Sequence, residues 1–164
     1  MIFIPEIPNN SLKDELEEIV FLAKTAVNSE AYEEELLTFK FNKPATEDEL
    51  AAFEKELNVE FDEEYKDFLR FSNGAILCFN AAEFYNMDTV ISLAKQEKEE
   101  GFPDDYIIIG EVIGDGEVVC FSKSKRNYIS YFGGRETDYK NLPEFLDAAI
   151  KSIKGSLYDY IDID

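Results

Sequence analysis

The chain has 164 residues, of which 45% are hydrophobic and 14% aromatic, so it can fill the core of one ordinary domain. Its 36 acidic and 16 basic residues give a formal net charge of -20, which disfavours binding to nucleic acids and to anionic membranes. This charge indicates basic proteins, basic peptides or cations as partners, although an acidic surface also serves solubility alone.

The first ten residues are not expected to form a signal peptide, because Pro5, Glu6 and Pro8 interrupt the apolar run. No stretch approaches the ~20 apolar residues of a membrane span. Without a secretory signal, Cys78 and Cys120 are expected to be buried free thiols, and the cytoplasm is the expected compartment.

The first half of the chain is predicted to be mainly helical. Residues 11–28 have apolar side chains at helical spacing, and Ser11 is their expected N-cap. Residues 36–41 are predicted to be a short strand or an extended arm. Two further helices are expected at 46–57 and 62–72.

Local signals support the bounds of these two helices. Thr46 and Glu49 have the spacing of a capping box, in which each side chain satisfies the other's free backbone amide. Asp62 is expected to cap the second helix, and Asn73-Gly74 is expected to end it, since glycine tolerates the left-handed conformation.

The second half of the chain is rich in β-branched and aromatic residues, which favour strands. The predicted elements are strands at 76–79 and 82–85, a helix at 88–99, strands at 106–113, 117–123 and 128–132, and a last helix at 142–154. Helices, an antiparallel meander and a covering helix predict a single α+β domain with helices packed around a central, mainly antiparallel β-sheet. The residues predicted to be largely buried are Phe53, Tyr65, Phe68, Leu69, Ile108, Phe121, Phe145 and Leu146.

Catalytic chemistry is disfavoured by the residue types present. Histidine is absent, which removes the usual general base and the commonest metal ligand, and two cysteines cannot form a structural zinc site alone. The pairs Glu111 with Glu117 and Asp104 with Asp105 resemble acid–base pairs, but solvated surface is the favoured interpretation in so acidic a chain. The sequence therefore predicts no enzyme activity, no cofactor and no metal.

One stretch resembles a known family. Residues 45–75 are similar to the opening block of the SUKH superfamily, in which a helix with a Glu near its end precedes a helix carrying Tyr-Lys-x-Phe-Leu and closing on Asn-Gly. The residues that fit this block are Glu54, Tyr65, Phe68, Leu69, Asn73 and Gly74. Residues 102–132 look like the central strands of the family, and residues 142–150 are similar to its closing helix.

The resemblance implies an α+β fold and a non-enzymatic binding role. Bacterial members look like immunity proteins that neutralise polymorphic toxins, often nucleases, and fungal members look like regulators of cell-wall synthesis. We therefore expect residues 40–154 to be a SUKH-like domain, residues 1–39 an N-terminal helical extension packed on the core, and residues 155–164 an acidic C-terminal tail.

The leading hypothesis is an immunity protein that binds a cognate nuclease toxin, and the alternative is a regulatory or adaptor module without a toxin partner. An enzyme or small-ligand carrier and an acidic mimic of nucleic acid are less favoured, and the sequence does not predict the oligomeric state. The partner, a cognate toxin or another basic protein, is expected at the loops and sheet edges near the 115–116 turn. The candidate binding residues are Asp104, Asp105, Asp115, Glu117, Glu136, Asp138 and Tyr139, with Tyr128 and Tyr131 as further aromatic candidates.

Overall fold

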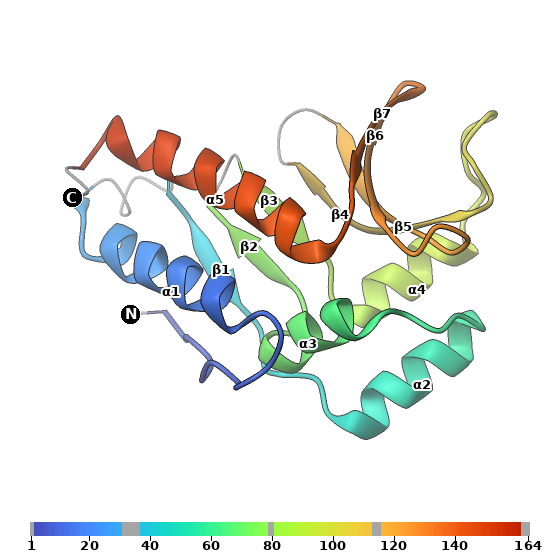
Figure 1. Cartoon of the computed structure of the whole chain (residues 1–164), viewed down its shortest axis with the longest axis horizontal. Coiled ribbons are helices and arrows are strands. Elements are labelled where there is room, and N and C mark those ends of the chain that lie inside the picture. Colours follow the sequence, from blue (N-terminus) through green and yellow to red (C-terminus); the bar gives the residue numbers. More distant parts are fainter. Residues whose placement is uncertain (1, 31–36, 79–80, 113–115, 162–164) are drawn as a thin grey trace.

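Helices and short strands follow one another along the chain in the order that Figure 1 shows. The computed structural model describes residues 2–30, 37–78, 81–112 and 116–161. The elements are α1 (Lys13–Val27), β1 (Phe39–Phe41), α2 (Glu47–Leu57), α3 (Glu63–Phe71), β2 (Ala75–Leu77), β3 (Ala82–Phe84), α4 (Met87–Lys95), β4 (Tyr106–Val112), β5 (Glu117–Ser122), β6 (Tyr128–Phe132), β7 (Arg135–Tyr139) and α5 (Leu142–Tyr158).

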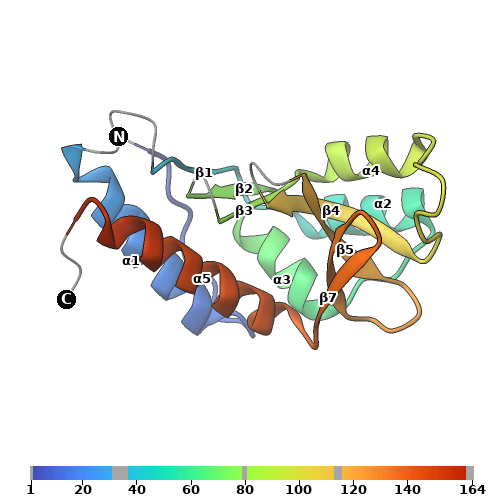
Figure 2. The same cartoon turned by 90° about the horizontal axis from the view of Figure 1, so that it is seen from above.

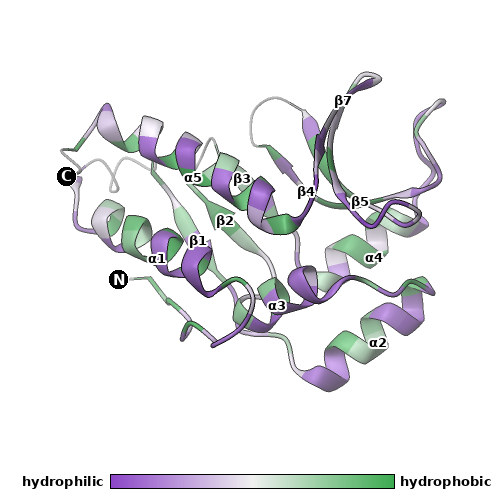
Figure 3. Ribbon diagram, viewed as in Figure 1, coloured by the Kyte–Doolittle hydropathy of each residue, from purple (hydrophilic) through white to green (hydrophobic). Residues whose placement is uncertain are grey.

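Within these residues, seven strands form one antiparallel sheet in which each strand pairs with the next along the chain, from β1 to β7. The predicted α+β class and the mainly antiparallel sheet are thus confirmed. β7 was not predicted, because its sequence, RETDY, has none of the apolar alternation of a half-buried strand. Figure 3 shows these hydrophilic residues along β7, which is one edge of the sheet. Charged side chains on an edge strand discourage pairing with other chains.

The helices cover the two faces of the sheet unequally. Figures 1 and 2 show α1, α3 and α5 on one side of the sheet and α4 on the other side, beside β4. α1 packs against α5, and α2 packs against α4. The side covered by α3 and α5 is called the inner face below, and the opposite side is called the outer face.

The main core lies between the inner face and the helices. Phe84 of β3 packs against Phe68 of α3 and Phe145 of α5, with ring centroids 4.4 Å and 5.7 Å away. The rings of Phe53 and Phe61 stack 5.1 Å apart, which joins α2 to the segment before α3. The inner-face strand residues of this core include Leu77, Phe84, Ile107, Ile109, Val119, Phe121 and Tyr128.

The predicted burial is confirmed at seven of the eight positions: Phe53, Tyr65, Phe68, Leu69, Phe121, Phe145 and Leu146. Ile108 is the exception, since its side chain is only half-buried. It pairs with Cys120 and packs on a smaller cluster on the outer face. The run of three isoleucines in β4 is apolar on both faces, so its sequence does not reveal which residue points inward.

The observed starts of α2 and α3 match the predicted ones, because both predictions rested on a side-chain cap that the structure contains. Thr46 and Glu49 form the predicted capping box, and the Asp62 carboxylate accepts a hydrogen bond from the Tyr65 amide. The predicted cap of α1 is wrong, because α1 begins at Lys13 and its N-cap residue, Leu12, makes no side-chain cap. The Ser11 hydroxyl instead donates to Asp67 Oδ2 at 2.7 Å.

Two other helix bounds differ from the prediction. α4 spans Met87–Lys95 rather than 88–99 and is capped by the Asn86 side chain. α5 continues through Gly155 to Tyr158, because Leu157 is fully buried and extends the apolar stripe of the helix by one turn. The proposed division of the chain at residues 39/40 and 154/155 stays a prediction.

Cys78 and Cys120 are both buried, as expected. Among the helices in the described part of the chain, none is both long and apolar enough to span a bilayer.

Candidate protein-binding surface on the outer face of the sheet

The outer face carries a row of side chains that crosses the whole sheet. Because paired residues of adjacent strands point to the same face, the strand register places one residue of each strand in this row. From β1 to β7 these residues are Lys40, Ile76, Glu83, Glu111, Val118, Tyr131 and Glu136. Along this row, on the face that α3 and α5 leave open, the acidic pair Glu83 and Glu111 therefore lies between apolar side chains, and a charged residue stands at each end.

Three aromatic rings form a cluster at the β4–β6 end of this face. Phe102, in the segment before β4, lies 5.1 Å from Tyr131 and 6.2 Å from Tyr106 between ring centroids. The rings of Tyr106 and Tyr131 are 6.3 Å apart. All three pairs meet edge to face, the arrangement that the ring quadrupoles favour. Beneath them Cys120 is fully buried, and this burial raises the pKa of its thiol to about 12.

Three of the predicted acidic residues border this aromatic cluster. Glu136 accepts a hydrogen bond from the Tyr106 hydroxyl at 2.8 Å, and Asp138 follows on the same face of β7. Burial and this hydrogen bond raise the pKa of Tyr106, so its hydroxyl stays protonated and keeps donating. Asp104 is exposed and lines, with Phe102 and Tyr106, a hollow of about 540 Å³. The structure therefore brings Asp104, Glu136 and Asp138 to one side of the molecule.

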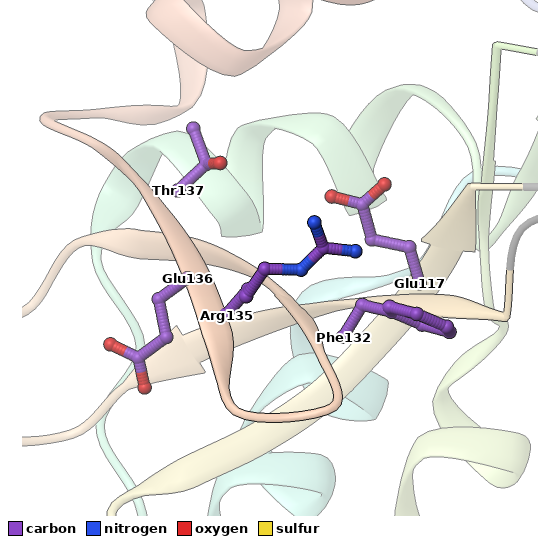
Figure 4. Close-up of a pocket in the computed structure, with 5 residues that line it drawn as sticks. All are labelled: Glu117, Phe132, Arg135, Glu136 and Thr137. Atoms are coloured by element: carbon purple, nitrogen blue, oxygen red, sulfur yellow. The ribbon is translucent and has the colours of Figure 1, made fainter.

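Glu117 and Tyr139 lie on the inner face instead. The Glu117 carboxylate accepts a hydrogen bond from the Ser130 hydroxyl, and Tyr139 packs edge to face against Phe145 at 5.2 Å. Glu117 lines a hollow of about 750 Å³ at the end of the β5–β7 strands. Figure 4 shows the Arg135 guanidinium there, pointing toward the Glu117 carboxylate. The predicted site is thus split between the two faces of the sheet.

Asp105 has a structural role that the sequence did not indicate. Its carboxylate accepts hydrogen bonds from the Ser122 hydroxyl and from the backbone amide and hydroxyl of Ser124, the latter two at 2.9 Å. Although burial opposes ionisation, these hydrogen bonds hold the pKa of Asp105 below its usual value. Asp105 therefore fixes the turn after β5, and its oxygens are already occupied. Asp115, also predicted, lies outside the described residues.

The tyrosine candidates also separate by face. Tyr128 is fully buried on the inner face, and its hydroxyl donates to Asp62, so it packs within the fold and is not available as an interface anchor. Tyr131 is half-buried in the outer aromatic cluster and keeps part of its ring accessible. Alternation along β6 places these two residues on opposite faces, since three positions separate them.

The strand register shows which carboxylates lie close together, and they are not the pair considered from the sequence. Glu111 pairs with Val118 and Glu117 pairs with Val112, so Glu111 and Glu117 point to opposite faces and cannot act together. The true neighbour of Glu111 is Glu83, directly opposite it on β3. Burial, a hydrogen bond to Glu111 and the charge of Glu111 all raise the pKa of Glu83. No sequence signal pairs these two residues, because α4 separates their strands and only the register joins them.

The described residues contain no group of three or more His, Cys, Asp or Glu side chains placed to hold a metal ion. The carboxylates of the outer face are instead dispersed among aromatic and aliphatic side chains. Such a mixed surface can contact a protein partner through both charge and apolar area.

Comparison with known proteins gives a family match and one relative. The model of the SMI1 / KNR4 family (SUKH-1) matches residues 44–148, which include the aromatic cluster and its acidic border. The uncharacterized protein YnaB of Bacillus subtilis strain 168 is 31% identical over 94 residues, 57% of this chain. The aligned region spans 62% of YnaB, less than two thirds of its length. Because the family model covers more than half of the chain, and as the Tyr-Lys-x-Phe-Leu and Asn-Gly residues indicated, the chain belongs to the SMI1 / KNR4 family (SUKH-1).

Proposed function

We propose that this protein is an immunity protein, which binds a cognate nuclease toxin directly and neutralises it. One observation carries the proposal: an aromatic cluster bordered by carboxylates lies on the sheet face that α3 and α5 leave open. Membership of the SMI1 / KNR4 family supports a protein-binding role, and the net charge of -20 supports a basic partner.

The electrostatic part of the proposal follows from the chemistry of nucleases. A nuclease binds phosphates with basic side chains, so its substrate-binding surface attracts an acidic protein. Complementary charge raises the association rate and disfavours partners of the wrong sign. Asp104 and Asp138, both exposed, place such charge beside the aromatic cluster.

The aromatic rings are expected to contribute binding energy once the toxin is in contact with this face. Tyrosine is enriched among the residues that dominate binding energy in protein interfaces, where surrounding contacts exclude water. Tyr131 and Tyr106 are held by ring contacts and by the hydrogen bond to Glu136, so little side-chain entropy is lost when a partner covers them.

The test begins with the cognate toxin, identified by purifying a tagged form of the chain from its native cell. The double variant Asp104→Lys, Asp138→Lys is then compared with Asp14→Lys, Glu17→Lys on α1, which carries the same change in charge outside the family match. We expect the first variant to associate with the toxin about tenfold more slowly at low salt, and the control to change much less. Equal association rates and equal protection of toxin-exposed cells in both variants would contradict the proposal.

A further inference from the structure

A groove with an apolar floor crosses the outer face and shares the rings of Phe102 and Tyr131 with the aromatic cluster. It has a volume of about 370 Å³ and lies between the segment after α4 and the β5–β6 strands. Its floor consists of Leu93, Phe102, Ile108, Val118 and Tyr131, all of them half-buried. Apolar side chains left partly accessible in a concave surface gain free energy when a partner's apolar group covers them.

Acidic side chains lie in the lining of this groove and next to it on the neighbouring strands, and they are called its rim below. Glu97 and Glu99 line it on the α4 side. Across the sheet, Glu111 is directly opposite Val118, and Glu136 is directly opposite Tyr131. Among the described residues that line the groove, only Lys98 is basic, and it donates to the Leu93 carbonyl at 3.2 Å and lies 5.9 Å from the centre of the Phe102 ring. The rim therefore complements a positively charged segment.

We propose that this groove receives one apolar side chain from an extended basic segment of the protein partner, flanked by Lys or Arg residues that reach Glu111 and Glu136. The inference rests on the proposed function for the identity of the partner, and it adds the chemistry of the segment that is recognised. A second copy of this chain is disfavoured as the occupant, because two acidic rims on two chains of charge -20 would repel each other.

The spacing of the row defines the pattern of that segment. Glu111, Val118, Tyr131 and Glu136 lie on four successive strands, so the two glutamates are three interstrand spacings, about 14 Å, apart. In an extended peptide, residues i and i+4 are also about 14 Å apart, and residues i, i+2 and i+4 point to the same side. The geometry thus fits the pattern basic-x-apolar-x-basic.

The probe is a nine-residue peptide with the core Lys-Ser-Phe-Ser-Arg, titrated into the full-length, isotope-labelled chain and followed by its backbone amide NMR signals. We expect shifts centred on Ile108, Val118 and Tyr131. Replacing Phe by Ser in the peptide should weaken binding at least about tenfold, and replacing both basic residues by Glu should abolish it. Shifts centred elsewhere, or equal binding of the Phe and Ser peptides, would overturn the inference.

A matched pair of variants locates the binding. Val118→Lys places a charged side chain in the groove, whereas Ile76→Lys makes the same change in the same row at β2, outside the groove. We expect Val118→Lys to abolish peptide binding and to weaken toxin binding at least about tenfold, with Ile76→Lys close to the unchanged chain.

The outcomes separate this inference from the proposed function. If Val118→Lys loses the peptide but binds the toxin and protects cells fully, the groove is not the partner's site and the proposed function stands. If the unchanged chain binds the peptide in the groove but neutralises no toxin, the proposed function fails and recognition of the basic segment stands.

Discussion

The two faces of the sheet are built from the same strands and differ in what covers them. On the inner face, Phe84, Phe121 and Tyr128 are at most 2% exposed beneath the helices. On the outer face, Glu111 and Val118 are half-buried and lie in a row with charged residues at both ends. One face therefore holds the fold together, and the other keeps a surface of mixed chemistry within reach of a partner.

The composition of the outer face is hard to explain by stability alone. A face that served only stability would be apolar and covered, and one that served only solubility would be polar and fully exposed. Here two glutamates stand directly opposite each other on β3 and β4, and burial together with the hydrogen bond and charge of Glu111 raises the pKa of Glu83. Like charges in this position destabilise a sheet, so their presence favours a binding role for this face.

The largest expected effect contrasts one phenylalanine from each side of the molecule. Phe68→Ala should lower the free energy of unfolding by about 3–5 kcal/mol, because the ring is fully buried and lies 4.4 Å from Phe84. Phe102→Ala, which truncates a half-buried ring on the outer side, should lower it by about 1 kcal/mol. Denaturant unfolding of both variants measures the difference. Equal losses would show that the inner and outer sides contribute equally to the free energy of unfolding, which would contradict the contrast drawn between the two faces.

The sequence revealed most of the fold because local signals agreed with the packing. Thr46, Glu49 and Asp62 marked helix starts with side chains that do cap those helices. α1 was bounded less well, since the chain before it is held by the distant Asp67 carboxylate rather than by a local cap. β7 was missed because it is an edge strand with mostly exposed residues, so it needs no apolar pattern.

The candidate site could be predicted only in part, because a sequence does not give strand register. Glu136, Asp138 and Asp104 do gather at the aromatic cluster, whereas Glu117 lies on the other face. The shift of register between Ile108 and Gly110 changes the alternation within β4, so counting residues from Tyr106 gives the wrong face for Glu111.

The shift of register in β4 depends on the glycine at position 110. A Cβ atom on Gly110 would lie 2.1 Å from the Glu83 carbonyl oxygen, so Gly110→Ala must displace β3 from β4. We expect it to lower the free energy of unfolding by about 1–3 kcal/mol and to disturb the outer row at Glu83 and Glu111. Thermal or denaturant unfolding measures the loss. Gly155→Ala in α5 is the control, because nothing lies within 4 Å of its added Cβ, and it should stabilise by about 0.5–1 kcal/mol.

The smallest expected effect is a gain of stability on the outer face. Glu83→Gln removes one of two opposed carboxylates and should raise the free energy of unfolding near neutral pH by about 0.2–1 kcal/mol. The charge of Lys40 partly offsets the repulsion in the unchanged chain, which keeps the gain small. Glu100→Gln, at an exposed position in the segment after α4, is the control for the loss of one negative charge.

The pH dependence of this gain identifies its cause. The pKa of Glu83 in the folded chain lies above its ordinary value of 4.5, so the folded state binds the proton more tightly than the unfolded state. The contribution of Glu83 to stability is therefore fully present below pH 4.5 and is lost as the pH rises through the folded-state pKa. Glutamine does not titrate, so the advantage of Glu83→Gln should be small in acid and should grow as the pH rises above 4.5. A difference in unfolding free energy that stays constant over that range, or that Glu100→Gln reproduces, would show that net charge rather than the Glu83–Glu111 pair is responsible. Glu111 also lies next to the groove that is proposed to receive a basic segment. If Glu83→Gln raises the free energy of unfolding and also weakens peptide binding, the two opposed glutamates cost stability and serve binding of the partner.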